Sequence, residues 1–246
     1  MEGPALSYLL RGGPRLTVGM MTADLLRLGQ EMELLEGAGL ELVHIDVMEG
    51  VFCPMLTVGP PVLRALRTRL LKDAHLMITD PLTKVEAFVE AGADMITFQV
   101  EGAPQPHRVL QVLGGATNAN DPERGIIRGI AVNPSTPLGT IEPLLDEVEY
   151  VLVLSVNPGW GGQAFIPSTE RRLGEARRMI EASGQKILLG VDGGVTRDNI
   201  ARVAAMGADV IVSGSAIFDG KAAAQNAAFM LDQVRAAAGP LPLVHV

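Results

Sequence analysis

The sequence predicts a single domain folded as a closed (β/α)8 barrel of the TIM type, and three observations lead to this fold. Short runs rich in Val, Ile and Leu alternate with longer segments of helical spacing, eight times along the chain. The apolar runs are nearly continuous, which is typical of parallel strands buried on both faces. The length of 246 residues agrees with the roughly 250 residues of such barrels. A doubly wound open sheet is the alternative, because one miscounted strand would change the prediction.

The expected elements follow one another without a linker or a shift in composition. The strands are expected at Arg15–Met20, Leu40–Val47, Ala74–Ile78, Met95–Val100, Ile126–Val132, Tyr150–Val156, Ile187–Asp192 and Val210–Ser213. The helices are expected at Ala23–Glu36, Pro61–Leu71, Leu82–Ala91, Pro106–Leu113, Leu138–Leu145, Thr169–Ser183, Thr196–Met206 and Ala222–Ala238. Residues 1–14, which Gly and Pro punctuate, are expected to form an N-terminal extension, and residues 15–246 the barrel.

Two Gly-Ala-Asp triplets stand where a helix is expected to end and a strand to begin. Gly92 and Gly207 open these triplets, and glycine suits the C′ position that follows a helix. Residues 114–124 contain Asn, Asp and Pro and are expected to form a surface loop without chemistry of its own.

Composition and charge exclude several classes of protein. The formal charge of −8 argues against a nucleic-acid partner and against an anionic membrane surface. The single cysteine, Cys53, rules out an internal disulfide framework and fits a reducing compartment. Because no apolar stretch is long enough for a bilayer and the N-terminus lacks the pattern of a signal peptide, we expect a cytoplasmic protein.

The segment His44-Ile45-Asp46 lies at the end of the second expected strand. Side chains alternate between the faces of a strand, so His44 and Asp46 share one face while Ile45 takes the other. Burying an imidazole or a carboxylate without a partner is costly. A metal ion would satisfy both groups at once, and a hydrogen-bonded His–Asp pair in the core is the alternative.

Two further polar residues are expected at the same end of the barrel, where functional residues of this fold gather. His75 lies in the third strand, and Asp192 ends the seventh. Taken singly, His75 suits a core histidine and Asp192 a helix N-cap. Together with His44 and Asp46 they form a donor set that suits zinc, iron, manganese or cobalt, with a position open for substrate. His107 and His245 are assigned to the surface.

The position of the two aspartates has a chemical consequence. Asp46 and Asp192 lie on the second and seventh strands, far apart around the ring. They can therefore approach a bound substrate from opposite sides. This arrangement suits removal of a proton from one face of a carbon and delivery of a proton to the other.

Three glycine-bearing loops follow the last three strands and indicate a phosphorylated ligand, because glycines let backbone amides approach an anion. Tight turns use the same residues and are the alternative. Met48 and Met77 each stand two residues after a proposed ligand and are expected to line the site. The residues of these loops that are expected to bind the substrate or its phosphate group are Gly159, Trp160, Gly161, Gly162, Gly193, Gly194, Gly214 and Ser215.

From about Leu16 to Phe218, the chain closely resembles the ribulose-phosphate 3-epimerase family. The motifs that carry the resemblance are His44–Met48, Leu56–Pro61, His75–Met77, Ala91–Asp94, Asn133–Pro137, Ser155–Gln163, Val191–Gly194 and Gly214–Ala216. The resemblance implies a barrel that interconverts D-ribulose 5-phosphate and D-xylulose 5-phosphate through an enediolate, and that assembles as a homo-oligomer. It also implies one divalent metal on His44, Asp46, His75 and Asp192, with the two aspartates as acid and base.

The chain departs from the family pattern at the rim of the site. Gly19 stands where an active-site serine is usual, and Gln99 where a histidine is usual. Further departures are Glu49, Val51, Cys53, Met55 and Leu154. Because lost polar groups can change substrate discrimination, a 3-epimerase of another phosphorylated ketose, such as a hexulose 6-phosphate, is an alternative. A non-catalytic barrel that binds sugar phosphate is another. A Rossmann-type dehydrogenase is disfavoured, because no Gly-Xaa-Gly-Xaa-Xaa-Gly motif follows the first strand.

Overall fold

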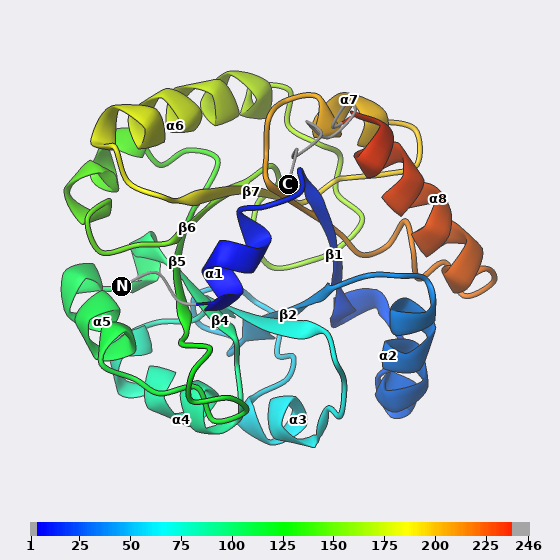
Figure 1. The fold of residues 1–246 in the computed structure, drawn as a ribbon, viewed down its shortest axis with the longest axis horizontal. Coiled ribbons are helices and arrows are strands. Elements are labelled where there is room, and N and C mark those ends of the chain that lie inside the picture. Colours follow the sequence, from blue (N-terminus) through cyan, green and yellow to red (C-terminus); the bar gives the residue numbers. More distant parts are fainter. Residues whose placement is uncertain (1–3, 238–246) are drawn as a thin grey trace, which may run out of the picture.

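Eight parallel strands close into a barrel in the computed structural model, which describes residues 4–237 (Figure 1). Each strand pairs with the next in the chain, and β8 pairs with β1. The closed (β/α)8 barrel predicted from the sequence is therefore confirmed over the alternative open sheet. The strands are β1 (Arg15–Gly19), β2 (Leu42–Met48), β3 (Leu71–Met77), β4 (Met95–Gln99), β5 (Ile127–Val132), β6 (Tyr150–Leu154), β7 (Leu188–Asp192) and β8 (Val210–Ser213).

Except for the N-terminal helix, the helices surround the barrel, and their apolar faces pack on the outward-facing strand residues in one continuous core (Figure 1). The α-helices are α1 (Pro4–Leu9), α2 (Leu28–Gly37), α3 (Pro60–Ala65), α4 (Val85–Glu90), α5 (Pro106–Gly114), α6 (Thr169–Ser183), α7 (Ile200–Ala204) and α8 (Ala223–Ala237). The 3-10 helices are η1 (Met20–Thr22), η2 (Leu25–Arg27), η3 (Pro81–Thr83), η4 (Val100–Gly102), η5 (Leu138–Thr140) and η6 (Glu142–Leu144). None of the helices within residues 4–237 is long and apolar enough to cross a membrane.

The helix expected at Leu138–Leu145 is wrong, because the segment forms the two 3-10 helices η5 and η6. Pro143 lies inside this segment, and its ring and missing N–H do not fit the interior of an α-helix. The first expected helix, Ala23–Glu36, likewise begins later, at Leu28, after η2. Ala238, the expected end of the last helix, lies outside the described residues, as does His245.

The start of β3 is also corrected, because the strand begins at Leu71 and not at Ala74. Lys72 and Asp73 are polar, but both are buried because the side chain of each finds a partner. Lys72 Nζ donates to Leu63 O of α3 at 3.4 Å, on the outer side of the sheet, and Asp73 Oδ1 accepts from Thr97 Oγ1 at 2.9 Å inside the barrel. This correction adds Asp73 to the inward-facing residues.

Both Gly-Ala-Asp triplets join a helix to a strand as predicted. Gly92 and Gly207 each have a φ of +86°, a conformation that glycine adopts without strain. The aspartates that follow each tie neighbouring strands together: Asp94 accepts from the Lys72 N–H, and Asp209 accepts from the Leu189 N–H at 2.7 Å. The triplet thus ends a helix and fixes the N-terminal end of a strand.

The loop of residues 114–124 is largely exposed, but it is anchored to the barrel. Asn118 is buried, and its amide nitrogen donates to Asp94 Oδ1 at 3.0 Å. The Arg124 guanidinium pairs with the same oxygen at 2.6 Å. The loop therefore neutralises the buried carboxylate at the start of β4.

Tyr150 and Gly190 fill the barrel interior as a complementary pair. Tyr150 is fully buried, and a Cβ atom on Gly190 would lie only 2.1 Å from its hydroxyl oxygen. Any larger residue at position 190 would collide with the ring. Together they close the interior below the site.

The N-terminal helix α1 lies across the end of the barrel opposite the carboxyl ends of the strands (Figure 1). Its residues Ala5, Leu6 and Leu9 are buried in a cluster with inward-facing strand residues such as Leu42 and Met95. This helix therefore closes the barrel at its N-terminal end. The division of the chain into an extension and a barrel domain stays a prediction.

We predict that Leu9→Ala lowers the free energy of unfolding by about 2–4 kcal/mol, because Leu9 is 2% exposed and its loss leaves a cavity. Leu10 follows it in the chain but is 37% exposed, so Leu10→Ala should cost less than about 1 kcal/mol. Urea unfolding of both variants measures the difference. Equal losses would mean that α1 does not seal the barrel.

Candidate active site

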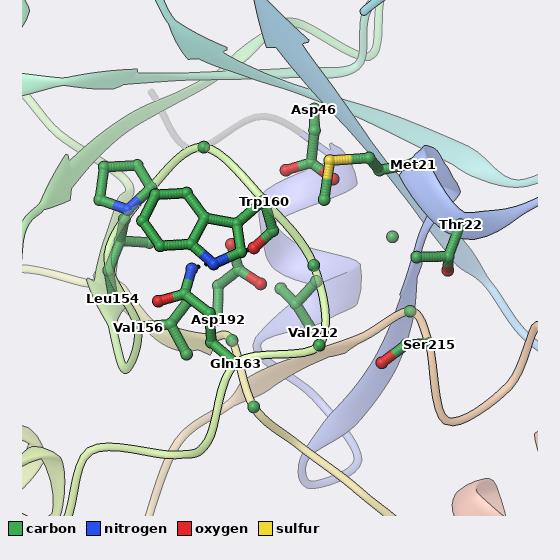
Figure 2. A pocket seen from close by; sticks show the side chains of 18 of the residues that line it. Met21, Thr22, Asp46, Leu154, Val156, Trp160, Gln163, Asp192, Val212 and Ser215 are labelled. Carbon is green, nitrogen blue, oxygen red and sulfur yellow. Dashed lines mark hydrogen bonds between the residues drawn. The ribbon is translucent and has the colours of Figure 1, made fainter. Parts of the chain in front are cut away.

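A pocket opens at the carboxyl ends of the strands and receives residues from six of them (Figure 2). His44 and His75 are fully buried and lie among the ligand atoms at its base. The pocket brings together the remaining sequence-predicted site residues, which are Gly19, Asp46, Met48, Met77, Gly159, Trp160, Gly161, Gly162, Asp192, Gly193, Gly194, Gly214 and Ser215.

Four side chains from β2, β3 and β7 place one donor atom each within 4.8 Å of the others. The His44 Nε2 and His75 Nδ1 atoms are 3.2 Å apart. Asp46 Oδ1 lies 3.4 Å from the first of these atoms and 3.6 Å from the second. Asp192 Oδ2 lies 3.8 Å from each of them.

This geometry fits a divalent metal ion. Donor atoms around a tetrahedral ion at 2.0–2.1 Å lie roughly 3.3 Å from one another. The shortest donor separation, 3.2 Å between two imidazole nitrogens, is close to that distance. Two imidazoles and two carboxylates also suit zinc, iron, manganese and cobalt. The cluster of His44, Asp46, His75 and Asp192 can therefore hold an ion.

Each histidine is oriented by a partner on the side away from the cluster. His44 Nδ1 donates to Asp73 Oδ2 at 2.8 Å, and Thr97 Oγ1 donates to the other oxygen of that carboxylate. A carboxylate only accepts, so when the His44 ring carries a single proton that proton lies on Nδ1, and the lone pair of Nε2 faces the cluster. Such carboxylate–histidine pairs are typical of metal ligands.

His75 has an amide partner instead. Its Nε2 lies 3.3 Å from the Gln99 side chain, whose oxygen accepts when its nitrogen donates to Glu101 Oε2 at 3.0 Å and to Ala131 O at 3.2 Å. His75 then presents the lone pair of Nδ1 to the cluster. Gln99 is thus compatible with the same ring orientation, although a histidine is usual at its position.

The charges of the cluster separate the pKa values of the two aspartates. Burial raises the pKa of Asp46, but His44 and His75 outweigh that effect and hold it below the usual range. Burial is also the largest influence on Asp192, and together with the charge of Asp46 it raises the pKa of Asp192 to about 6. Burial lowers the pKa of His44, but Asp73 and Asp46 offset this effect, and the result lies well above the usual value.

Sulfur atoms cover the pocket beside the cluster. Met48 and Met77 are buried and pack with Cys53, and Met21 and Phe52 lie against them. Burial raises the pKa of the Cys53 thiol to about 11, so it is neutral near pH 7. Met48 shares the inward face of β2 with Asp46, and Met77 shares the inward face of β3 with His75. This apolar cover keeps water away from part of the pocket.

The glycine-rich loops after β6, β7 and β8 also line the pocket. Gly193 has a φ of +112°, and a Cβ atom there would lie 2.3 Å from Val156 Cγ2. Gly194 has a φ of +64°, and its Cβ atom would lie 2.5 Å from the Phe165 backbone nitrogen. These positions require glycine for close packing, as well as for access to a ligand.

Backbone donors in these loops are free to bind a ligand. Within residues 4–237, the N–H groups of Gly162, Gly194 and Ser215 donate to no backbone acceptor. The Gln163 side chain holds the first of these loops by donating to Asn157 O at 2.6 Å and to Trp160 O at 3.0 Å. Free amides from three loops form a concave surface that suits an anion.

Several residues of the site escaped the sequence analysis. Asp73 stands two positions before His75 on the same strand face, a signal hidden because β3 was expected to begin at Ala74. Thr22 and Gln163 also line the pocket. Thr22 gave no signal in the sequence, because it lies between the expected strand that ends at Met20 and the expected helix that begins at Ala23. His107 lies away from the site, half exposed, with its Nε2 4.0 Å from Glu147 Oε1.

The sequence model of the Ribulose-phosphate 3 epimerase family matches residues 15–218. The chain belongs to this family. "Ribulose-phosphate 3-epimerase" of Escherichia coli (strain K12) is 43% identical over 203 residues, which cover 81% of this chain and 87% of that protein. The protein of the same name from Bacillus subtilis (strain 168) is 39% identical over 202 residues, covering 81% of this chain and 89% of that protein.

Solved structures share the fold of this epimerase-family chain at low sequence identity. KGPDC from Streptococcus mutans has a TM-score of 0.66 and 18% identity, covering 93% of this chain and 100% of that chain. 3-Hexulose-6-phosphate synthase from Salmonella typhimurium has a TM-score of 0.65 and 17% identity, covering 91% and 99%. These likenesses support the barrel fold.

The residues that depart from the family pattern take different places. Gly19 and Leu154 line the pocket, whereas Val51 is 77% exposed on the loop after β2. Glu49 fixes that loop, because its carboxylate accepts from the backbone N–H groups of Val51, Phe52 and Thr79. The loop after β2 therefore keeps an acidic anchor in this member of the epimerase family.

We predict that Gly194→Ala lowers the free energy of unfolding by at least about 2 kcal/mol, because its Cβ atom meets the Phe165 backbone. Gly162→Ala is the matched control. Gly162 also has a positive φ, +76°, but nothing lies within 4 Å of its added Cβ, so only a strain of about 1 kcal/mol is expected. Denaturant unfolding compares the two, and an equal loss would contradict the tight packing of Gly194.

Proposed function

We propose that this chain is a metal-dependent 3-epimerase that interconverts D-ribulose 5-phosphate and D-xylulose 5-phosphate. The observation that carries the proposal is the pair of carboxylates from β2 and β7, both within 3.8 Å of His44 Nε2. Membership of the epimerase family, and relatives named for this reaction at 39–43% identity, support the substrate class. The three loops with free amides supply a place for the phosphate group.

We propose that His44, Asp46, His75 and Asp192 hold one divalent ion, whose identity among zinc, iron, manganese and cobalt the donor set leaves open. When bound, the ion would supply Lewis acidity that stabilises negative charge on the oxygens beside the reacting carbon. Asp73 and Gln99 orient the two imidazoles for this purpose.

In the proposed mechanism, Asp46 and Asp192 move the protons. The carbonyl next to C3 makes the C3 proton acidic, and one carboxylate accepts that proton from one face of the carbon. The other carboxylic acid donates a proton to the opposite face, which inverts C3 without a net change in charge or oxidation state. Figure 2 shows the two carboxylates entering the pocket from different sides. The pKa of Asp46 lies below that of Asp192, so Asp46 is the more readily ionised carboxyl group and Asp192 the one that more readily holds a proton.

The remaining residues bind and shield the substrate in this proposal. Gly159, Trp160, Gly161, Gly162, Gly193, Gly194, Gly214 and Ser215 surround the phosphate group. Met48 and Met77 exclude water beside C3, and Gly19 leaves room next to Asp46. A homo-oligomer and a cytoplasmic location stay predictions, as does the lack of a nucleic-acid or membrane partner.

A 3-epimerase of a larger phosphorylated ketose is a second candidate, and one observation favours it. A Cβ atom added to Gly19 would lie 3.6 Å from its nearest neighbour, Asp46 Oδ2, which is an ordinary van der Waals distance. A larger side chain would therefore fit at this position, and the glycine leaves that space next to the proposed base unfilled. Activity on pentulose and hexulose phosphates, measured side by side, separates the two substrates.

We predict that the protein, incubated with ribulose 5-phosphate in deuterated water, forms xylulose 5-phosphate with deuterium at C3. Asp46→Asn and Asp192→Asn should each slow turnover by about 1,000-fold or more, because each removes a proton-transfer group. A time course by NMR measures both product and exchange. A near-normal rate in either variant would contradict the two-aspartate mechanism, and binding without exchange in the wild type would favour a non-catalytic barrel.

We predict that Asp73→Asn weakens metal binding by about 10–100-fold, because His44 loses the carboxylate that orients its ring. Competition with a chromophoric chelator measures the affinity. Asp198→Asn, which removes the same charge from an exposed residue, is the matched control and should leave affinity unchanged. If the two variants bind metal equally well, Asp73 does not support the ligand.

A further inference from the structure

One hydroxyl in the pocket wall has no partner. Thr22 ends η1, the 3-10 helix that follows β1, and it lines the pocket. Its Oγ1 atom is buried and makes no hydrogen bond with any residue that the structure describes. Buried hydroxyls are nearly always paired with protein or with an ordered molecule, because an unpaired one costs free energy. Among the unpartnered buried hydroxyls of the described residues, this one belongs to a residue of the pocket wall, where a bound ligand can supply the partner.

Thr22 is packed between two of the glycine-rich loops. A Cβ atom on Gly214 would lie 3.3 Å from Thr22 Oγ1, and one on Gly161 would lie 3.4 Å from Thr22 Cγ2. The methyl group thus faces the loop after β6, and the hydroxyl faces the loop after β8. Figure 2 shows Thr22 on the same side of the pocket as Ser215. The hydroxyl lies beside the loops whose backbone donors are free, and Met21 Cε packs next to the methyl group of Thr22 at Gly161.

The charge of the pocket makes this hydroxyl important for an anion. Within residues 4–237, the pocket is lined by two carboxylates, Asp46 and Asp192, but by no Lys or Arg. A phosphate group must then be held by neutral dipoles alone. Gly19, on the same edge of the pocket, has no side chain to contribute. Each side-chain hydroxyl therefore carries a larger share of the binding.

We propose that Thr22 is a further substrate-binding residue, whose Oγ1 donates a hydrogen bond to the phosphate group of the ligand. It completes a set of donors with the Gly162, Gly194 and Ser215 amides. The inference rests on the proposed function for the identity of the phosphorylated ligand, but the donor itself recognises any phosphate monoester.

The test removes the hydroxyl and keeps the shape of the side chain. Thr22→Val should raise KM for ribulose 5-phosphate by about 10-fold or more and change kcat by less than about 2-fold. The reason is that the lost hydrogen bond to the charged phosphate group is equally strong in the bound substrate and in the transition state. Thr22→Ser keeps the hydroxyl and should stay within about 3-fold of the wild type. Thr169→Val is the matched control, because Thr169 also buries an unpartnered hydroxyl but lies outside the pocket.

A second measurement does not depend on turnover. Inorganic phosphate, titrated against thermal unfolding, should bind wild type and Thr22→Ser alike and Thr22→Val about 10-fold more weakly. If the wild type binds phosphate in this way but epimerises neither pentulose nor hexulose phosphate, the Thr22 proposal stands and the proposed function fails. If epimerase activity is present and Thr22→Val leaves both KM and phosphate affinity unchanged, the hydroxyl only holds water and the Thr22 proposal is wrong.

Discussion

The buried imidazole of His44 is the group on which the site depends. One ring nitrogen contacts Asp73 at 2.8 Å, and the other lies within 3.8 Å of His75, Asp46 and Asp192. Isolated charges at this depth would be strongly destabilising, so each member of the cluster is stable only because the others are present. Three strands must therefore meet at one point inside the barrel.

Strand register determines which groups meet. In the pairing of β2 with β3, His44 stands opposite Asp73, and Asp46 stands opposite His75. Imidazole and carboxylate thus alternate both along each strand and across the pair. A slip by one residue would turn all four side chains to the outer face of the barrel, where helices pack. Closure of the sheet then brings Asp192 of β7 to the same point, which an open sheet would not do.

The alternation of side chains along a strand explains why the sequence predicted the metal-ligating residues but not the residues that support them. His44, Asp46 and Asp192 followed from polar residues at the ends of apolar runs. Asp73 did not, because Lys72 and Asp73 look like a polar loop until the partners of Asp73, His44 in β2 and Thr97 in β4, are known. Thr22 carries no local signal either, since its role depends on Gly161 and Gly214, which are distant in sequence. Local patterns predict faces of strands, whereas partners across the barrel require the fold.

The acidic site and an anionic ligand are compatible because the carboxylates lie at one end of the pocket and neutral backbone amides at the other. Asp46 and Asp192 lie with the imidazoles, and a divalent ion there would offset their charge. The other end binds through amides, which attract phosphate without adding a titratable group. Gly193 and Gly194 are held by packing against Val156 and Phe165, so these amides are fixed before a ligand arrives. A fixed phosphate position, in turn, sets the distance at which C3 meets the two carboxylates.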